Sequence, residues 1–464
     1  MDRWLITGAA LMTGDGERKG ALRTAGGRIA EVLPADLGDE DADALAARHG
    51  ATRVDGTGLV LVPGAVDPHV HFALPAGGTV TVDDFVSGSQ AALAGGTTTI
   101  IDFITPSRKQ TLVEASELRL AEAAACACDY ALHGTVTSWR RDTPADLAAA
   151  ADRYGLRSLK LYMAYLDSIG LEERDLAKAM GAAAELDLVV LLHCEDGAMI
   201  EGQIRELHEA GRRDPEAHAL ARTARAEGTA VRTAMALAGR TGARPYVVHI
   251  STGAAMAAIA AARADGRTVY AETCPQYLLL DEGAYRCPFE HAAAAVMSPP
   301  LRPACQADAL RGLLGRGAFD VVATDHCAFN LAGQKDRGRD DFTRIPGGAP
   351  GVQERLALLW TLGVATGLIT PADWVRLTAE NPARIFGLWP RKGSLQPGAD
   401  ADLVLWDPFA ERIITQATAR SRADHSLWEG RRTVGAPVKV WSRGELVLDG
   451  ERLDAPAGRG LYLR

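Results

Sequence analysis

Histidine and aspartate residues in this sequence recur at the ends of short apolar runs. One run ends with His69 and His71, and residues two apart on a strand point to the same side, so both imidazoles would face one space. Three further apolar runs end in His193, His249 and Asp325. Four imidazoles and one carboxylate are a ligand set that suits a borderline metal such as zinc.

Each of these residues has a simpler explanation on its own. A single histidine at a strand end is more often hydrogen-bonded within the protein than bound to a metal. Even the pair at His69 and His71 is a moderate signal. Five such residues in register are not expected by chance, because chance would scatter them over loops and helices. The sequence therefore predicts one shared metal site.

A lysine lies inside another apolar run, Ser158–Met163. A buried lysine loses its charge or needs a partner, so Lys160 could form a buried salt bridge or extend to water. The sharper prediction is a neutral amine that adds carbon dioxide and becomes a carbamate bridging two metal ions. Charge favours this prediction, because four neutral histidines and Asp325 compensate two divalent ions poorly. A carbamate and a bridging hydroxide would each remove one positive charge.

The middle of the chain, residues 56–385, must position these groups. Short β-rich runs alternate there with Ala-rich stretches such as Asp175–Leu186, Thr229–Thr241 and Ala254–Asp265, which predicts a parallel sheet covered by helices. Eight strands fit an α/β fold of the (β/α)8 TIM-like barrel type, whose functional residues lie at the carboxyl ends of strands. The eight runs are Leu59–Phe72, Thr97–Phe103, Tyr130–Thr137, Ser158–Met163, Leu188–Cys194, Pro245–Ser251, Thr268–Thr273 and Asp320–Asp325.

The two ends of the chain share a sequence pattern that differs from that of the middle. Residues 1–55 and 386–464 contain short apolar runs separated by Gly, Asp and Pro, which indicates hairpin-like strands. Neither end has enough strands to close a core, so we predict that both pack together as one small β-sandwich domain interrupted by the barrel. The acidic stretch Asp36–Asp43 is predicted to be a solvated loop.

Composition excludes several classes of protein. The 464 residues are 47% hydrophobic and 23% charged, as in a soluble globular enzyme, and the net charge of −9 argues against a nucleic-acid partner. No apolar run reaches the roughly 18 residues that span a bilayer, so no membrane partner is expected. Seven scattered cysteines and an opening Met1–Ile6 without signal-peptide character predict reduced thiols in the cytoplasm.

With these residues in place, the chain resembles the amidohydrolase superfamily, and within it the dihydropyrimidinases and D-hydantoinases. The resemblance covers nearly the whole chain. Its marks include Asp67–Phe72, Gly77–Thr79, Asp83–Phe85, Ala94–Thr99, Lys160–Tyr165, Glu272–Leu278, Ser298–Arg302, Ala323–His326 and Gly393–Asp402.

The resemblance implies two zinc ions bridged by carboxylated Lys160 and a hydroxide. The first ion would be held by His69, His71 and Asp325, and the second by His193 and His249.

The resemblance also implies roles in catalysis and substrate binding. Tyr165 would donate its hydroxyl to the oxyanion, and Asp325 would carry the proton from water to the leaving ring nitrogen. Ser298 and Gly347 would contact the ring imide, mainly through the backbone. The expected reaction is hydrolysis of dihydropyrimidines or 5-substituted hydantoins to N-carbamoyl amino acids, and the expected assembly is a homotetramer.

The sequence departs from the family pattern at three places. Gly347 stands where Asn is usual, which would leave the pocket roomier. Asp196 stands where Asn is commoner, which could alter the charge behind the ligands. The segment Ala221–Gly228 lacks a family-typical Ser-Arg-Pro.

Neighbouring families remain alternatives. Dihydroorotases carry an Arg just after the histidine pair, where this chain has Phe72-Ala73-Leu74, and allantoinases usually lack the tyrosine matching Tyr165. A non-catalytic scaffold relative would have lost metal ligands, whereas all six positions are filled here. The substrate preference stays open. Phe72, Leu74 and Leu166 are expected to line an apolar subsite, and His218 is expected to face solvent.

Overall fold

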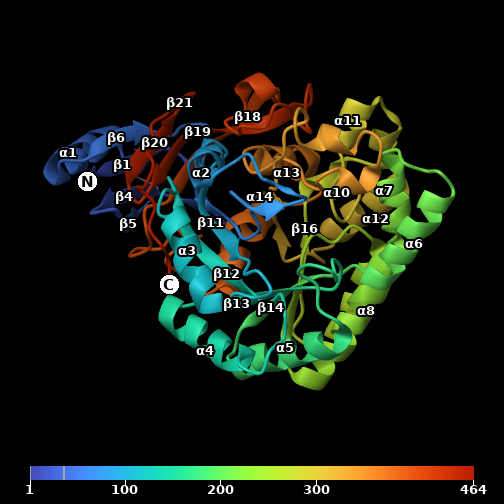
Figure 1. Ribbon diagram of the computed structural model, residues 1–464. Coiled ribbons are helices and arrows are strands. Elements are labelled where there is room, and N and C mark those ends of the chain that lie inside the picture. The colour runs from blue at the N-terminus through green and yellow to red at the C-terminus, as the bar shows by residue number, and fades with distance from the viewer. Residues whose placement is uncertain (1, 35–36) are drawn as a thin grey trace.

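The computed structural model describes residues 2–34 and 37–464, and its centre is an eight-stranded parallel sheet curled into a barrel (Figure 1). Neighbouring strands follow one another in chain order, and the ends of the sheet meet where Val70 pairs with His326. The strands are β8 (Ala65–Asp67), β11 (Thr97–Ile104), β12 (Asp129–Thr135), β13 (Ser158–Tyr162), β14 (Val189–His193), β15 (Arg244–Val247), β16 (Tyr270–Thr273) and β17 (Val321–Val322). The predicted barrel is confirmed.

Side chains alternate between the inside and the outside of the barrel. Val189 and Leu191 of β14 pack with Ile101 and Phe103 of β11. Alternate residues of most strands belong to the same cluster, which fills the interior of the barrel. Val190 belongs to the outer cluster, where helices cover the sheet. Burial on both faces explains why these strands are continuous apolar runs rather than alternating ones.

Helices surround the barrel on its outer face (Figure 1). The three predicted helices are confirmed as α5 (Glu173–Glu185), α8 (Ala224–Thr241) and α9 (Gly253–Ala264). The other helices of more than six residues around the sheet are α2 (Phe85–Ala94), α3 (Leu112–Ala123), α4 (Thr143–Tyr154), α6 (Gly197–Glu209) and α12 (Ala304–Leu314). The shorter ones are α7 (Glu216–Ala221), α10 (Pro275–Leu279), α11 (Phe289–Ala294), α13 (Arg355–Leu359), α14 (Pro371–Val375) and α15 (Asn381–Ile385). Across the described ranges, we find no helix with the length and apolarity to cross a bilayer.

Strands from the two chain ends form two further sheets, and Figure 1 shows their blue and red ribbons side by side. The seven-stranded sheet is ordered β21 (Arg452–Leu453), β20 (Glu445–Asp449), β19 (Arg432–Ser442), β18 (Leu403–Ile413), β7 (Val60–Pro63), β2 (Ala10–Thr13) and β3 (Gly16–Lys19). The four-stranded sheet is ordered β5 (Arg28–Leu33), β4 (Ala21–Ala25), β1 (Trp4–Thr7) and β6 (Thr52–Asp55). The division at residues 55 and 385 stays a prediction.

Two local predictions need correction. The run Leu59–Phe72 contains two strands, because the chain turns at Gly64, and its first part, β7, pairs with β18 in the chain-end sheet. The acidic stretch is not a loop, because α1 (Asp39–His49) begins within it. Its acidic residues form the first turn of this helix, where the helix dipole favours negative charge. Asp36 lies outside the described residues.

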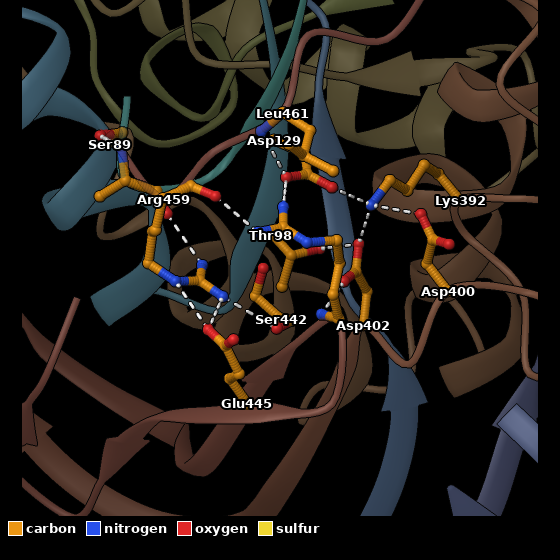
Figure 2. A network of polar contacts seen from close by, with 12 residues as sticks. Ser89, Thr98, Asp129, Lys392, Asp400, Asp402, Ser442, Glu445, Arg459 and Leu461 are labelled. Carbon is orange, nitrogen blue, oxygen red and sulfur yellow. Dashed lines mark hydrogen bonds and ion pairs between the residues drawn. The ribbon is translucent and has the colours of Figure 1, made fainter. Parts of the chain in front are cut away.

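A buried polar network ties the barrel to the chain-end sheets (Figure 2). Nζ of Lys392 lies 2.5 Å from Asp129, 2.7 Å from Asp402 and 3.0 Å from Asp400. Arg443, the residue after β19, also pairs with Asp129. Asp129 is the first residue of β12, so the network lies at the amino-terminal end of the barrel, away from the strand ends that carry the predicted ligands.

Candidate functional site

Three predicted ligands meet where β8 and β17 end. Oδ1 of Asp325 lies 3.2 Å from Nε2 of His69 and 3.2 Å from Nε2 of His71. The possible ligand atoms of the three residues all lie within 4.8 Å of one another. Nε2 of His69 is buried and has no hydrogen-bond partner among the described residues. A buried lone pair aimed at a carboxylate and another imidazole fits a bound cation.

The other two histidines face each other across the same space. Nδ1 of His193 lies 2.9 Å from Nε2 of His249. His193 continues the inward alternation of Val189 and Leu191. His249 follows the inward Val248 and would point outward in a regular strand, but its φ of +40° redirects it into the barrel mouth.

Backbone strain is concentrated at this site. Tyr165, His249 and Asp325 have φ values of +60°, +40° and +53°, a region that residues other than glycine seldom adopt. Such conformations persist where the surrounding structure holds them, and they cluster at functional sites. The strain therefore supports a functional role for the three residues.

Two carboxylates that the sequence reasoning missed fix the outer nitrogens of the histidines. Oε1 of Glu272 lies 2.7 Å from Nδ1 of His69, and Oε2 of Glu195 lies 2.8 Å from Nε2 of His193. Such partners set the tautomer and leave the inner nitrogen free to bind a metal. Both glutamates were detectable, because each lies at or just past the end of an apolar strand.

Burial sets the protonation of these groups. It lowers the pKa of His69, His193 and His249, so their imidazoles stay neutral and keep a lone pair. Burial alone would raise the pKa of Asp325, but His69 and the hydrogen bond with His71 outweigh it, and the carboxyl stays ionised. Neutral imidazoles beside an ionised carboxylate are the state that metal binding requires.

Lys160 projects into the barrel between the outward side chains of Leu159 and Leu161. Its side chain is buried, and its Nζ lies 5.2 Å from the ring centroid of Phe103 and 5.1 Å from that of Tyr162. Within the described ranges its amine forms no ion pair, which disfavours the salt-bridge alternative. Burial lowers the pKa of Lys160 to about 8.

One pocket of about 800 Å³ brings all the predicted site residues together. They are His69, His71, Lys160, Tyr165, His193, His249, Ser298, Asp325 and Gly347. At Gly347 a Cβ atom would lie 3.4 Å from Oγ of Ser298, so the missing side chain leaves room beside that contact.

The lining of the pocket corrects three expectations. Leu74 lines it as expected, but Phe72 does not, because its ring packs against Phe85 with centroids 6.0 Å apart. Leu166 does not line it either, and Ile169 takes that place. His218 is not solvent-facing. It is buried and lines the pocket, with Nε2 2.8 Å from the carbonyl oxygen of Met297.

The pocket also contains Arg222, from the segment that lacks Ser-Arg-Pro. Its side chain is buried, pairs with Glu195 and lies over the ring of Tyr165. Sequence reasoning did not single it out, because Arg222 follows no strand and its partners are distant in the chain.

Comparison with known proteins gives consistent matches. A profile of the amidohydrolase family matches residues 60–447. A D-hydantoinase of Geobacillus stearothermophilus is 38% identical over 416 residues, covering 89% of this chain and 88% of that protein. A D-hydantoinase of Streptomyces coelicolor is 38% identical over 461 residues, covering 99% and 97%. The crystal structure of a dihydropyrimidinase from Brevibacillus agri superposes with a TM-score of 0.95 at 36% identity, covering 99% of this chain and 98% of that one.

Proposed function

The chain belongs to the amidohydrolase family, and we propose that the pocket at its barrel mouth is where it hydrolyses cyclic amides. The protein is an enzyme that opens the ring of dihydropyrimidines or 5-substituted hydantoins and yields N-carbamoyl amino acids. The observation that carries the site assignment is the convergence of nine predicted residues on one pocket.

The chemistry of the donor set fits two divalent metal ions. His69, His71 and Asp325 would hold one ion, and His193 and His249 the other. Lys160 would bridge them as a carbamate, which agrees with its buried amine and lowered pKa. Zinc suits this mixture of imidazole and carboxylate ligands. When bound, such ions polarise a carbonyl group and lower the pKa of water to about 7.

The residues of the pocket transfer the proton, stabilise the oxyanion and bind the substrate ring. Asp325 accepts the proton of the attacking water and delivers it to the leaving ring nitrogen. The Tyr165 hydroxyl donates to the oxyanion that develops on the ring carbonyl. Burial raises the pKa of Tyr165, so its phenol stays protonated and able to donate. Ser298 and Gly347 form the wall that would receive the imide edge of the ring.

The pocket lining supports a substrate with an apolar substituent. Leu74, Ile169 and Phe342 contribute apolar surface, as a 5-aryl hydantoin would require. An allantoin-like ureide is the second candidate substrate, because it presents a similar ring edge. Tyr165 in the pocket weighs against it, since allantoinases usually lack this tyrosine.

Ring opening by the zinc-loaded protein tests the function, with dihydrouracil and a 5-aryl hydantoin offered in parallel. Turnover of either one is the expected result, and the ratio of the two values of kcat/KM ranks the substrates. Absence of turnover with both, when two equivalents of metal are bound, would contradict this substrate class and favour allantoin or a scaffold role.

The homotetramer is also a proposal. Phe409 and Ile413 of β18 leave 79% and 56% of their surface exposed, which is unusual for large apolar side chains and suits a subunit contact. Light scattering would give the mass of the assembly. A cytoplasmic location stays a prediction.

A further inference from the structure

We infer that Arg222 is a positioning residue that holds the tyrosine donor and a metal ligand in place with one guanidinium group. This inference rests on the proposed function, because it assigns Arg222 a role in the same site. Arg222 lies between α7 and α8, and its side chain reaches the pocket from outside the ring of strands.

One edge of the guanidinium acts on the metal ligands. Nη1 of Arg222 donates to Oε2 of Glu195, and the same oxygen lies 2.8 Å from Nε2 of His193. Glu195 is fully buried, and its Oε1 has no hydrogen-bond partner in the described part of the chain. Arg222 is therefore the cation that stabilises a buried carboxylate, and this carboxylate orients His193 with Nδ1 toward His249.

The same guanidinium group also contacts the tyrosine. Cζ of Arg222 lies 4.9 Å from the ring centroid of Tyr165. His193 and Tyr162 are also neighbours of this ring, at 5.3 Å and 6.3 Å between centroids. The backbone of Tyr165 has φ +60°, so the tyrosine needs packing partners to keep its orientation. Arg222 supplies one of these partners.

Arg222 is itself held rigidly. Nη1 of Arg302 donates to its carbonyl oxygen, and Nη2 of Arg302 donates to Glu227 at 2.9 Å. Both members of this second ion pair are buried. Thr223, the next residue, caps α8 by accepting a hydrogen bond from the amide of Ala226. The guanidinium is therefore fixed before substrate arrives, as a positioning group must be.

The two contacts require arginine rather than any cation. A planar guanidinium can bind a carboxylate through its edge while its face lies against an aromatic ring. The ammonium group of a lysine could replace the charge beside Glu195, but it is too compact to keep the contact with the Tyr165 ring at the same time. The structure thus predicts that the two roles of Arg222 can be separated by substitution.

The experiment compares Arg222→Lys and Arg222→Met in the zinc-loaded enzyme. Metal loss to a coloured chelator and ring opening are measured separately. Arg222→Lys should lose metal at a rate close to wild type, while kcat falls roughly 10-fold or more with little change in KM. Arg222→Met leaves Glu195 without its cation and should also lose metal roughly 10–100-fold faster. Equal rates of metal loss in Arg222→Lys and Arg222→Met would contradict the inference that the contact with Glu195 and the contact with Tyr165 can be separated.

The Tyr165→Phe background supplies a second readout that a purely structural role would not move. If Arg222 positions the hydroxyl, Arg222→Lys should reduce kcat much less when that hydroxyl is already absent. The same fold loss in both backgrounds would overturn the inference.

Arg443→Met is the matched control. It removes another arginine that pairs with a buried aspartate, Asp129, but at the opposite end of the barrel. It should leave metal loss and kcat unchanged, and parallel losses in this variant would contradict a specific role for Arg222. If the wild-type enzyme opens no ring, the proposed function fails, whereas the metal-loss comparison still tests the contact with Glu195.

Discussion

Nδ1 of His193 and Nε2 of His249 face each other at 2.9 Å in the barrel mouth. Nε2 of His193 is directed at Glu195, and Arg222 keeps the pKa of that glutamate at about 2 against the effect of burial. The ionised carboxylate accepts a hydrogen bond from Nε2–H, so Nδ1 of His193 carries the lone pair. The atom that we propose as a metal ligand is thus oriented by groups that are not themselves proposed ligands.

The substitution Lys160→Ala should remove metal and activity together. Without Lys160 no carbamate can form, and the remaining donors compensate two divalent ions poorly. Metal content by mass spectrometry and ring opening measure the effect. Lys335→Ala is the control, since it removes another buried amine, one that binds backbone carbonyls. Wild-type metal content in Lys160→Ala would refute a bridging role.

Reconstitution of the metal-free protein should depend on pH through Lys160. Carbon dioxide adds only to the neutral amine, and burial lowers the pKa of this amine to about 8. At a fixed concentration of dissolved carbon dioxide, the rate of reactivation with zinc should therefore rise about 10-fold per unit below pH 8 and level off above it. A rate that continues to rise toward pH 10 would indicate an ordinary lysine.

The substitution Tyr165→Phe should preserve metal binding and reduce kcat on the order of 10²-fold, the usual cost of a lost oxyanion donor. Zinc content and steady-state kinetics distinguish this from a packing effect. Tyr154→Phe is the control. It removes a hydroxyl from α4, outside the pocket, and should leave zinc content and kcat unchanged. A Tyr165→Phe enzyme with the wild-type rate would reduce this residue to a packing role.

The substitution Gly347→Asn should narrow the pocket without loss of metal. A Cβ atom at this position meets Oγ of Ser298 at 3.4 Å, which the flexible serine can accommodate. We expect kcat/KM for a 5-aryl hydantoin to fall roughly 10-fold relative to dihydrouracil, because the added side chain takes space from the larger substrate. An unchanged ratio would show that Gly347 does not set selectivity.

The substitution Lys392→Met should destabilise the fold by about 3–5 kcal/mol, because it leaves buried Asp129, Asp400 and Asp402 without their shared cation. Urea unfolding measures this. Lys178→Met removes an exposed pair with Asp175 and should cost about 0.5 kcal/mol or less. Similar losses in both variants would contradict the importance of burial.

The convergence of the candidate ligands on one pocket could be predicted, because burial dictates their sequence pattern. Strands covered on both faces read as apolar runs, and His193 stands out against Val189–Leu192. The pairing of β7 with β18 could not be predicted, because it joins segments from opposite parts of the chain.

The supporting groups were harder to predict than the ligands. Arg222 contacts Glu195, and His218 is buried against the carbonyl oxygen of Met297, through contacts that only the folded chain creates. The proposed metal ligands were thus visible in the sequence, and the groups that orient them were mostly not.

The seven-stranded sheet also has a consequence for the order of synthesis. β7 needs β18 as its neighbour, and about 340 residues separate Pro63 from Leu403. A ribosome adding about 5–20 residues per second takes roughly 20–70 seconds to cover that distance. During this interval the edge of β7 that later pairs with β18 has unpaired backbone groups, and it is open to chaperones and to other nascent chains. Synthesis of β18 therefore ends this interval.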